Sequence, residues 1–289
     1  MPTAPTPLAL RRVRTNGIET TVATAGAGPA ILLLHGFPHT WQVWNTVIGP
    51  LAHHFRVLAP DLRGLGAATR AADGYDSANL ALDAAGVLDA LGEPNADVIA
   101  IDAGVPAAFL LALHHPERVR RLVLMEATLG TLPGAEAFHA GGPPWWFGFH
   151  AVPDLAETVL IGHEAEYIDW FLTAGTRGHG VPPNERSAFL DAYSGRESLR
   201  GAFSHYRAMP TTAHQIDAAV STHRLTTPTT AIGAHPVGES LACQLRPITN
   251  NLTEHVIPDC GHIIPLDRPD ALLEALADAL GVPLRLSTP

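Results

Sequence analysis

The chain has 289 residues, of which 46% are hydrophobic and 16% are charged. This composition indicates a globular protein with a large core. The formal charge of −10 argues against nucleic acid and anionic membrane surfaces as partners. No apolar run approaches the roughly 20 residues of a membrane span, and residues 1–7 lack the pattern of a signal peptide. Two cysteines, Cys243 and Cys260, predict buried small residues rather than a disulfide or metal framework, so we expect a cytoplasmic protein.

The first part of the chain alternates apolar strand-like runs with stretches of helical periodicity. In chain order we expect strands at Arg11–Thr15 and Ile18–Thr24, a strand at Ala30–Leu34, a helix around Trp44–His53, a strand at Phe55–Pro60, a helix at Ser77–Leu91, a strand at Asp97–Ile101, a helix at about Val105–His114 and a strand at Arg121–Met125. Asn16-Gly17 is a strong hairpin signal, and Ser77 is expected to cap its helix. The alternation predicts an α/β fold with a doubly wound, mostly parallel sheet.

The strand pattern stops between residues 131 and 225. Twelve of the eighteen aromatic residues lie in this interval, which shows helical stretches and no convincing buried strand. The pattern resumes with strands at Thr229–Ile232 and His255–Pro258 and a helix at Pro269–Leu280. We therefore expect residues 1–130 and 226–289 to form the core, and residues 131–225 to form a helical cap.

Asp102 follows an apolar strand and precedes a helix, with small residues around it in Ala100-Ile101-Asp102-Ala103-Gly104. A tight strand-to-helix turn accepts only small neighbours and presents its central side chain above the sheet edge. A carboxylate in that place attacks saturated carbon and gives an alkyl ester, whereas a serine would attack a carbonyl. A helix-capping aspartate is the simpler reading of the same residue.

Three other loops at predicted strand ends supply partners, because functional groups of open α/β sheets collect at the carboxyl ends of the strands. His262 follows the last strand, where the general base of a nucleophile–acid–histidine order belongs. Glu126 ends the preceding central strand and is favoured over Asp259 as the acid that orients His262. The backbone N–H groups of Phe37 and Ala103 are expected to form an oxyanion hole.

These residues together resemble the α/β-hydrolase superfamily, and within it the epoxide hydrolase and haloalkane dehalogenase branch. The likeness covers nearly the whole chain. It rests on His35-Gly36-Phe37-Pro38 with Trp41 and Trp44, on Asp61-Leu62-Arg63-Gly64-Leu65-Gly66, on the Asp102 turn, on Met125-Glu126-Ala127 and on Gly261-His262. The resemblance implies a cis peptide between Phe37 and Pro38 and supports Glu126 as the acid.

In epoxide hydrolases, cap tyrosines hydrogen-bond the epoxide oxygen. His205-Tyr206-Arg207-Ala208 looks like the second of their cap-tyrosine motifs, whereas the region of the first carries tryptophans, whose N–H donates a hydrogen bond but no proton. The resemblance therefore assigns Tyr206 a catalytic role. Substrate contacts are expected from Trp145, Trp146 and Phe149 in the cap and from His35 and Pro38 in the core.

The expected function is hydrolysis of an epoxide on a bulky, hydrophobic substrate, aromatic or polyketide-like, without a metal or cofactor. Ile101 and Ala103 replace the histidine and tryptophan that the family usually carries before and after the nucleophile. The replacement is expected either to enlarge the pocket for a large flat substrate or to mark a drift away from hydrolysis. A dehalogenase remains an alternative, although Phe37 and Ala103 stand where that group carries halide-binding donors. A cofactor-free lyase, isomerase or cyclase and a non-catalytic binding protein also remain open, as does the choice between monomer and homodimer.

Overall fold

The computed structural model describes residues 7–286, and within them eight strands form one sheet in the order β1-β2-β4-β3-β5-β6-β7-β8. The strands are β1 (Ala9–Thr15), β2 (Ile18–Ala25), β3 (Ala30–Leu34), β4 (Arg56–Pro60), β5 (Ala96–Ile101), β6 (Val119–Met125), β7 (Thr229–Gly233) and β8 (Leu252–Val256). β2 is antiparallel to β1 and to β4, and all other neighbouring strands are parallel. The continuous apolar runs of β3 and β5 are fully buried, as parallel strands covered on both faces require.

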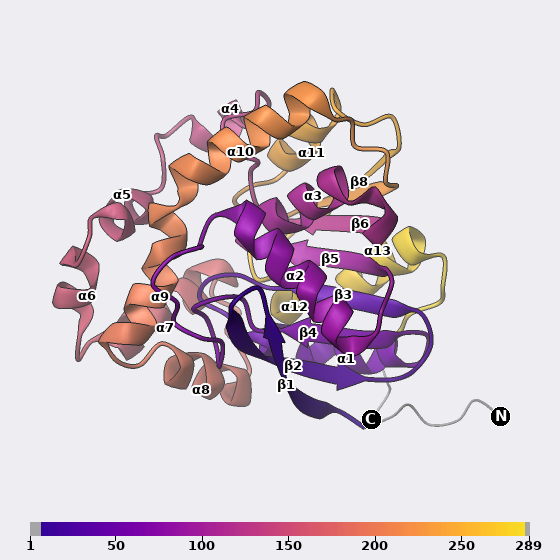
Figure 1. The fold of residues 1–289 in the computed structure, drawn as a ribbon. Helices are drawn as coiled ribbons and strands as arrows, with labels where there is room; N and C mark the ends of the chain where they lie inside the picture. Colours follow the sequence, from indigo (N-terminus) through magenta and orange to yellow (C-terminus); the bar gives the residue numbers. More distant parts are fainter. Residues whose placement is uncertain (1–6, 287–289) are drawn as a thin grey trace.

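Helices cover both faces of this sheet. The core helices are α1 (Asn45–Ala52), α2 (Ser77–Leu91), α3 (Gly104–His114), α11 (Ser240–Leu245), α12 (Ile264–Asp267) and α13 (Pro269–Leu280), with short 3-10 helices at Trp41–Trp44 and Pro116–Arg118. The connection from β3 through α1 to β4 runs toward β1, whereas those through α2, α3 and α11 run toward β8. Right-handed crossovers therefore place α1 on one face and α2, α3 and α11 on the other. Figure 1 shows α2 and α3 in front of the strands.

Seven helices connect β6 to β7 within the described residues, in the interval where the sequence predicts a helical cap. They are α4 (Glu136–His139), α5 (Trp145–Ala151), α6 (Leu155–Leu160), α7 (Glu164–Gly175), α8 (Pro183–Ala192), α9 (Arg196–Arg207) and α10 (Met209–Thr222). In Figure 1 most of them form a layer beside the core, and α10 returns across it toward α3. This arrangement covers one edge of the sheet.

The direction of the chain reverses between β3 and β5, which are neighbours in the sheet although β4 lies between them in sequence. Ligands of open α/β sheets bind at such a switch point, outside the carboxyl ends of the strands. The loop after β3 and the turn after β5 therefore meet at one place. These are the segments that carry Phe37 and Asp102.

Most predicted elements agree with the structure, and the strand at Ala30–Leu34 and the helices at Ser77–Leu91 and Pro269–Leu280 agree residue for residue. The strand predicted at His255–Pro258 is wrong, because β8 begins three residues earlier, at Leu252. β8 is an exposed edge strand, so its hydrophobic signal is weak. The predicted capping role of Ser77 is also wrong, since the side chain of Asp76 caps α2 and Ser77 is the first helical residue.

Two smaller expectations concern the cysteines and membrane spans. Cys260 is buried as predicted, whereas Cys243 is only partly buried, and neither forms a disulfide. Within residues 7–286, no helix combines the length and the hydrophobicity that crossing a bilayer requires.

Candidate active site

Asp102 occupies a tight turn between β5 and α3 and has a φ of 54°, a left-handed conformation that side chains rarely adopt. The turn has no room for larger neighbours. A Cβ atom on Gly36 would lie 2.0 Å from Oδ1 of Asp102, and one on Gly104 would lie 2.7 Å from the carbonyl oxygen of Leu34. The two glycines therefore let the loop after β3 approach the turn closely enough to touch the carboxylate.

Both predicted backbone donors reach this carboxylate. The amide of Phe37 donates to Oδ1 of Asp102 at 2.8 Å, and the amide of Ala103 also donates to the Asp102 carboxylate. The peptide between Phe37 and Pro38 is cis, as the family resemblance implies. One carboxylate oxygen is therefore already held where a negative charge would develop.

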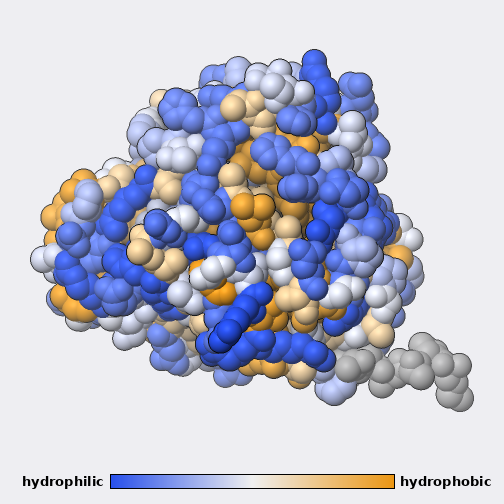
Figure 2. Space-filling view, in the orientation of Figure 1, coloured by the Kyte–Doolittle hydropathy of each residue, from blue (hydrophilic) through white to orange (hydrophobic). Residues whose placement is uncertain are grey.

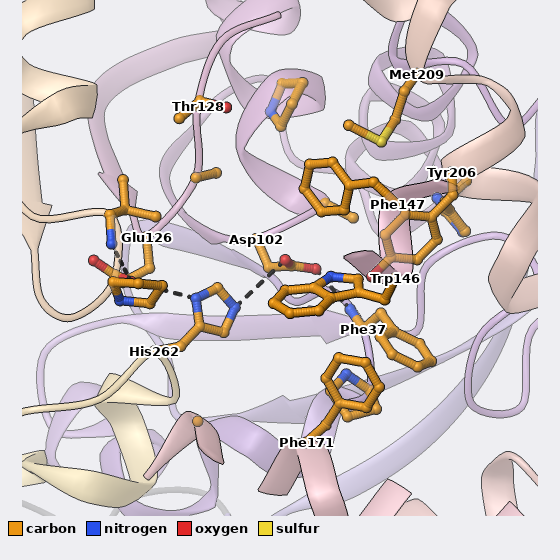
Figure 3. Close-up of a pocket in the computed structure, with 18 of the residues that line it drawn as sticks. Phe37, Asp102, Glu126, Thr128, Trp146, Phe147, Phe171, Tyr206, Met209 and His262 are labelled. Carbon is orange, nitrogen blue, oxygen red and sulfur yellow. Dashed lines mark hydrogen bonds and ion pairs between the residues drawn. The ribbon is translucent and has the colours of Figure 1, made fainter. Parts of the chain in front are cut away.

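His262 lies on the other side of Asp102 and connects it with Glu126. Its Nε2 atom is 3.4 Å from Oδ2 of Asp102, and its Nδ1 atom is 3.4 Å from Oε2 of Glu126. Figure 3 shows the three side chains in a row. The three residues follow β5, β6 and β8 in the chain, and the parallel sheet places the ends of these strands along one edge.

Glu126 is fixed in place from two sides. Only 1% of the residue is exposed, its Oε1 accepts the Ala234 amide at 2.5 Å, and its Oε2 accepts the Val237 amide at 3.4 Å. The competing acid, Asp259, has a side chain that is 69% exposed and pairs with Arg268 at 2.9 Å. The structure therefore brings Glu126 to the histidine, and Asp259 faces the surface.

The charges of Asp102, His262 and Glu126 stabilise one another. Burial alone would lower the pKa of His262, but hydrogen bonds and charge from Asp102 and Glu126 raise it to about 10. Burial raises the pKa of Asp102, and the hydrogen bond and charge of His262 more than offset this, so the net shift is downward. At neutral pH the row is a carboxylate–imidazolium–carboxylate arrangement.

Tyr206, on α9, faces the same cavity from the cap. Its ring packs between those of Phe37, Phe147 and His150, with centroid distances of 5.8, 5.7 and 4.4 Å. Burial and the charge of Asp102 raise the pKa of its hydroxyl well above the usual range. Tyr206 therefore keeps its proton and can act as a donor toward the space above Asp102.

The cavity around these groups has a volume of about 370 Å³ and mostly apolar walls. Trp146 and Pro38 line it, as predicted, together with Phe147, Phe171 and Trp170 from the cap. Figure 3 shows the indole of Trp146 and the rings of Phe147 and Tyr206 on the side of Asp102 opposite His262. The Trp146 indole N–H and the Tyr206 hydroxyl are therefore hydrogen-bond donors on the cap side of the cavity.

Three predicted substrate contacts do not line this cavity, as far as the described residues define its wall. Trp145 is 54% exposed and packs on Trp170 at 5.6 Å. Other exposed hydrophobic residues on the outer surface of the cap include Leu155, Val159 and Ile161, and orange patches appear at the left edge of Figure 2, where Figure 1 places α5 and α6. Phe149 is partly buried and packs inside the cap against His150 and Tyr167, with ring centroids 5.9 and 6.2 Å apart.

His35 is the third predicted substrate contact that does not line the cavity. It is fully buried, and its Nε2 accepts the Leu62 amide at 3.1 Å. Its Nδ1 then carries the proton and donates to the Gly36 carbonyl oxygen at 3.0 Å. The ring therefore holds two core loops together beneath the site and does not reach the cavity.

Sequence reasoning missed several residues near the site. His39 is fully buried, with no hydrogen bond to either ring nitrogen among the described residues, and its ring is stacked toward that of His262 at 6.4 Å. Its position directly after the Phe37-Pro38 peptide was the available signal. Phe171, Ser77 and Thr212 also line the cavity, and in the sequence they look like ordinary helix residues.

Comparison with known proteins places this geometry in a family. Residues 29–163 match the family model described as alpha/beta hydrolase fold. The soluble epoxide hydrolase of Corynebacterium sp. (strain C12) is 30% identical over 282 residues, which cover 90% of this chain and 92% of that protein.

Solved structures agree with this assignment over almost the whole chain. Cfl2 from Burkholderia cenocepacia superposes with a TM-score of 0.82 and 30% identity, covering 94% of this chain and 95% of that one. The epoxide hydrolase CorEH superposes with a TM-score of 0.86 and 25% identity, covering 95% and 99%. The chain therefore belongs to the α/β-hydrolase superfamily, within its epoxide hydrolase branch, and is a hydrolase.

Proposed function

We propose that this protein opens the epoxide ring of a bulky, hydrophobic substrate and releases a vicinal diol. The observation that carries the proposal is the state of the Asp102 carboxylate. Its Oδ1 is held by the amide of Phe37 at 2.8 Å, and its Oδ2 lies toward His262 at 3.4 Å. A carboxylate presented in this way is a nucleophile for saturated carbon.

In the first step, Oδ2 of Asp102 forms a bond to an epoxide carbon, and the carbon–oxygen bond of the ring breaks. The oxygen keeps the bonding electrons and becomes an alkoxide. Tyr206 donates a hydrogen bond to it and supplies a proton, while the Trp146 N–H adds a second hydrogen bond. The product of this step is a hydroxyalkyl ester of Asp102.

Ester formation changes the role of His262. The negative charge of Asp102 is one of the causes that raise the pKa of His262 to about 10, and alkylation removes that charge. The pKa of the imidazole then falls, so His262 releases its proton, which restores the hydroxyl of Tyr206 after that residue has protonated the alkoxide. His262 is left as a neutral base beside the ester.

In the second step, neutral His262 takes a proton from water, and the hydroxide attacks Cγ of Asp102. The negative charge of the tetrahedral intermediate develops on Oδ1, which the Phe37 amide already holds, and the Ala103 amide also donates to this carboxylate. Collapse breaks the ester bond, and the imidazolium returns its proton to the departing diol oxygen. Asp102 is left as a carboxylic acid and passes its proton to His262, which restores the starting ion pair. Glu126 keeps the ring oriented and stabilises its charged form.

The substrate class follows from the cavity. Its volume of about 370 Å³ and its aromatic walls suit a large apolar molecule. The small side chain of Ala103, next to the nucleophile, leaves space that a larger residue would fill. An aromatic or polyketide-like epoxide fits this description.

The decisive experiment is the intact mass of His262→Gln after incubation with aryl epoxides of increasing size and with haloalkanes. The chain contains no lysine, which removes one source of non-specific alkylation. We expect a mass gain equal to a whole epoxide, which disappears in the double variant with Asp102→Asn. An adduct that has lost its halide, formed with haloalkanes alone, would favour a dehalogenase. Failure of every epoxide to form an adduct would contradict the proposal and favour a lyase, isomerase or binding role.

A further inference from the structure

The cavity extends away from Asp102 into a groove between three helices. α2, α3 and α10 pack against one another. Each contributes two cavity-lining residues at i and i+3, which lie on one face of a helix: Ser77 and Leu80, Ala103 and Pro106, and Met209 and Thr212. Ala103 and Pro106 are about 5 Å apart along the helix axis, so the groove continues past the nucleophile by roughly one turn.

Two hydroxyl groups are buried in this otherwise apolar groove. Ser77 is 4% exposed and Thr212 is 9% exposed. The Thr212 hydroxyl accepts the Ser77 amide at 3.1 Å and donates to the Ser77 hydroxyl at 3.2 Å. The pair therefore holds two hydroxyl protons but uses only one, and the other has no acceptor in the described part of the chain.

The free proton is a consequence of how α2 begins. Asp76 caps the helix through the Asn79 amide at 3.2 Å, and Gln215 accepts the Ala78 amide at 3.0 Å. Thr212 completes the set by accepting the Ser77 amide. Because side chains of Asp76 and α10 satisfy the first backbone donors, the Ser77 hydroxyl is free to face the cavity at the positive end of a 15-residue helix.

The other hydrogen-bond donors at this end are already occupied, although the acceptor Nδ1 of His205 has no partner among the described residues. The Tyr75 hydroxyl donates to the Ala71 carbonyl oxygen at 2.8 Å, and Nε2 of His205 donates to the Arg63 carbonyl oxygen at 2.8 Å. The free hydroxyl proton of the Ser77–Thr212 pair is therefore the donor that remains for a ligand. A buried donor without an acceptor is costly, which favours a ligand atom that accepts its proton.

We propose that Ser77 and Thr212 form a second binding site in the cavity, which holds a neutral oxygen acceptor, a ketone or ester carbonyl, remote from the epoxide. The positive end of α2 favours an oxygen that carries partial negative charge. A carboxylate does not fit, because Asp76 adjoins the site and no arginine is among the described residues that line the cavity. The site rests on the proposed function only for the identity of the reacting group.

The test compares ligands of equal shape that differ in one oxygen. The reactive pair is 4-acetylstyrene oxide and 4-isopropylstyrene oxide, with their meta isomers. The unreactive pair is 4′-ethylacetophenone and 1-ethyl-4-isopropylbenzene, whose Kd is measured by quenching of the fluorescence of Trp146 and Trp170, both of which line the cavity. The unreactive pair reports on the site even if the protein does not open epoxides.

The variant Ser77→Ala removes one hydroxyl and keeps the backbone amide that Thr212 caps. The double variant Ser77→Ala/Thr212→Val removes both hydroxyls. We expect the preference for the acetyl over the isopropyl ligand, in Kd and in KM, to fall about three- to ten-fold in the double variant. The single variant is expected to lose less, because Thr212 can redirect its proton.

The controls are Thr212→Ser, which keeps the hydroxyl, and Thr128→Val, which removes a hydroxyl from another part of the wall. Both are expected to keep the wild-type preference, and thermal melting verifies that each variant is folded. Equal loss for both ligands, no loss in the double variant, or loss in Thr128→Val would overturn the site. A selective loss in Kd without any adduct on Asp102 would support the site and contradict the proposed function.

Discussion

The amide nitrogen of Phe37 donates a hydrogen bond of 2.8 Å to Oδ1 of Asp102, although 65 residues separate the two in sequence. This contact gives the two oxygens of the Asp102 carboxylate different roles. Oδ1 is held by the Phe37 amide, and Oδ2 faces His262 and the cavity. The oxygen that would become the ester carbonyl is therefore fixed before substrate arrives, which is the preorganisation that lowers the barrier to its hydrolysis.

The division of roles predicts where the oxygen of water goes. In a single turnover in ¹⁸O-labelled water, hydroxide attacks Cγ of Asp102, so we expect one labelled oxygen in the peptide that contains Asp102 and none in the diol. Peptide mass spectrometry after proteolysis measures this. Label in the diol after one turnover would mean that water attacks the substrate directly, and Asp102 would then be a base.

Glu126 is expected to matter for the second step more than for the first. In Glu126→Gln an amide faces Nδ1 of His262 and disturbs its orientation and charge, so ester hydrolysis should slow at least about 100-fold. Asp102 still attacks, and the adduct should accumulate in wild-type-like amounts during rapid quench. The matched control is Glu157→Gln, a fully buried glutamate paired with Arg207 in the cap, which should lower Tm without accumulation of adduct. Equal behaviour of the two variants would contradict a role for Glu126 at the histidine.

Tyr206 is expected to act in ring opening. Tyr206→Phe removes a donor to the alkoxide and should slow adduct formation about 100-fold, and Trp146→Phe should slow it about 10-fold. Tyr193→Phe is the control, because Tyr193 also packs edge-on against Phe37, at 5.3 Å, while its hydroxyl is bound to the His39 carbonyl oxygen. Pre-steady-state mass measurements give the rates. If Tyr206→Phe matches Tyr193→Phe, Tyr206 is only part of the wall.

The ion pairs of His262 predict a loss of stability in base. Its pKa in the folded protein is raised to about 10, so the folded state keeps a proton that the unfolded state releases near pH 6.5. The stabilisation is fully present below about pH 6.5 and disappears as the pH rises toward 10. Between pH 6.5 and 10.5, the Tm of the wild type should therefore fall more than that of His262→Gln. Parallel curves for the two proteins would rule out this linkage.

Buried neutral histidines predict the opposite change in acid. Burial is the first cause that lowers the pKa of His39 and His150 to about 3 and that of His205 to about 4. Below pH 6.5 these histidines become protonated in the unfolded chain but stay neutral in the folded protein. The free energy of unfolding therefore falls as the pH drops toward 4.

The variant His39→Leu tests this, because the ring of His39 makes no hydrogen bond within the described residues. Denaturant titrations from pH 6.5 to 4.5 should show a shallower loss of stability, by about one proton. The exposed His214, changed to Leu, serves as the control. A wild-type slope in His39→Leu would show that His39 is protonated in the folded protein.

Local signals were enough for the elements that position the nucleophile. The apolar run before Asp102 and the small residues around it predicted the strand, the turn and the helix, and Glu126 and His262 followed from their places at strand ends. β8 was misplaced because an exposed edge strand buries few side chains and leaves a weak pattern. Trp145 and Phe149 were wrongly placed in the cavity because four aromatic residues share the short helix α5, and only packing decides which of them reach the cavity.

Sequence alone determined the α/β class, and it predicted a carboxylate at the strand-to-helix turn with Glu126 and His262 as its partners, since each of these depends on residue type and local periodicity. The tertiary structure decided which cap side chains enter the cavity, that His35 is a structural residue, and that Ser77 lines the cavity while Asp76 caps the helix in its place. These outcomes depend on contacts between segments up to 135 residues apart, such as that of Ser77 with Thr212. The hydrophobic periodicity of one segment does not show which distant side chain will accept a hydrogen bond from its unpaired backbone donors.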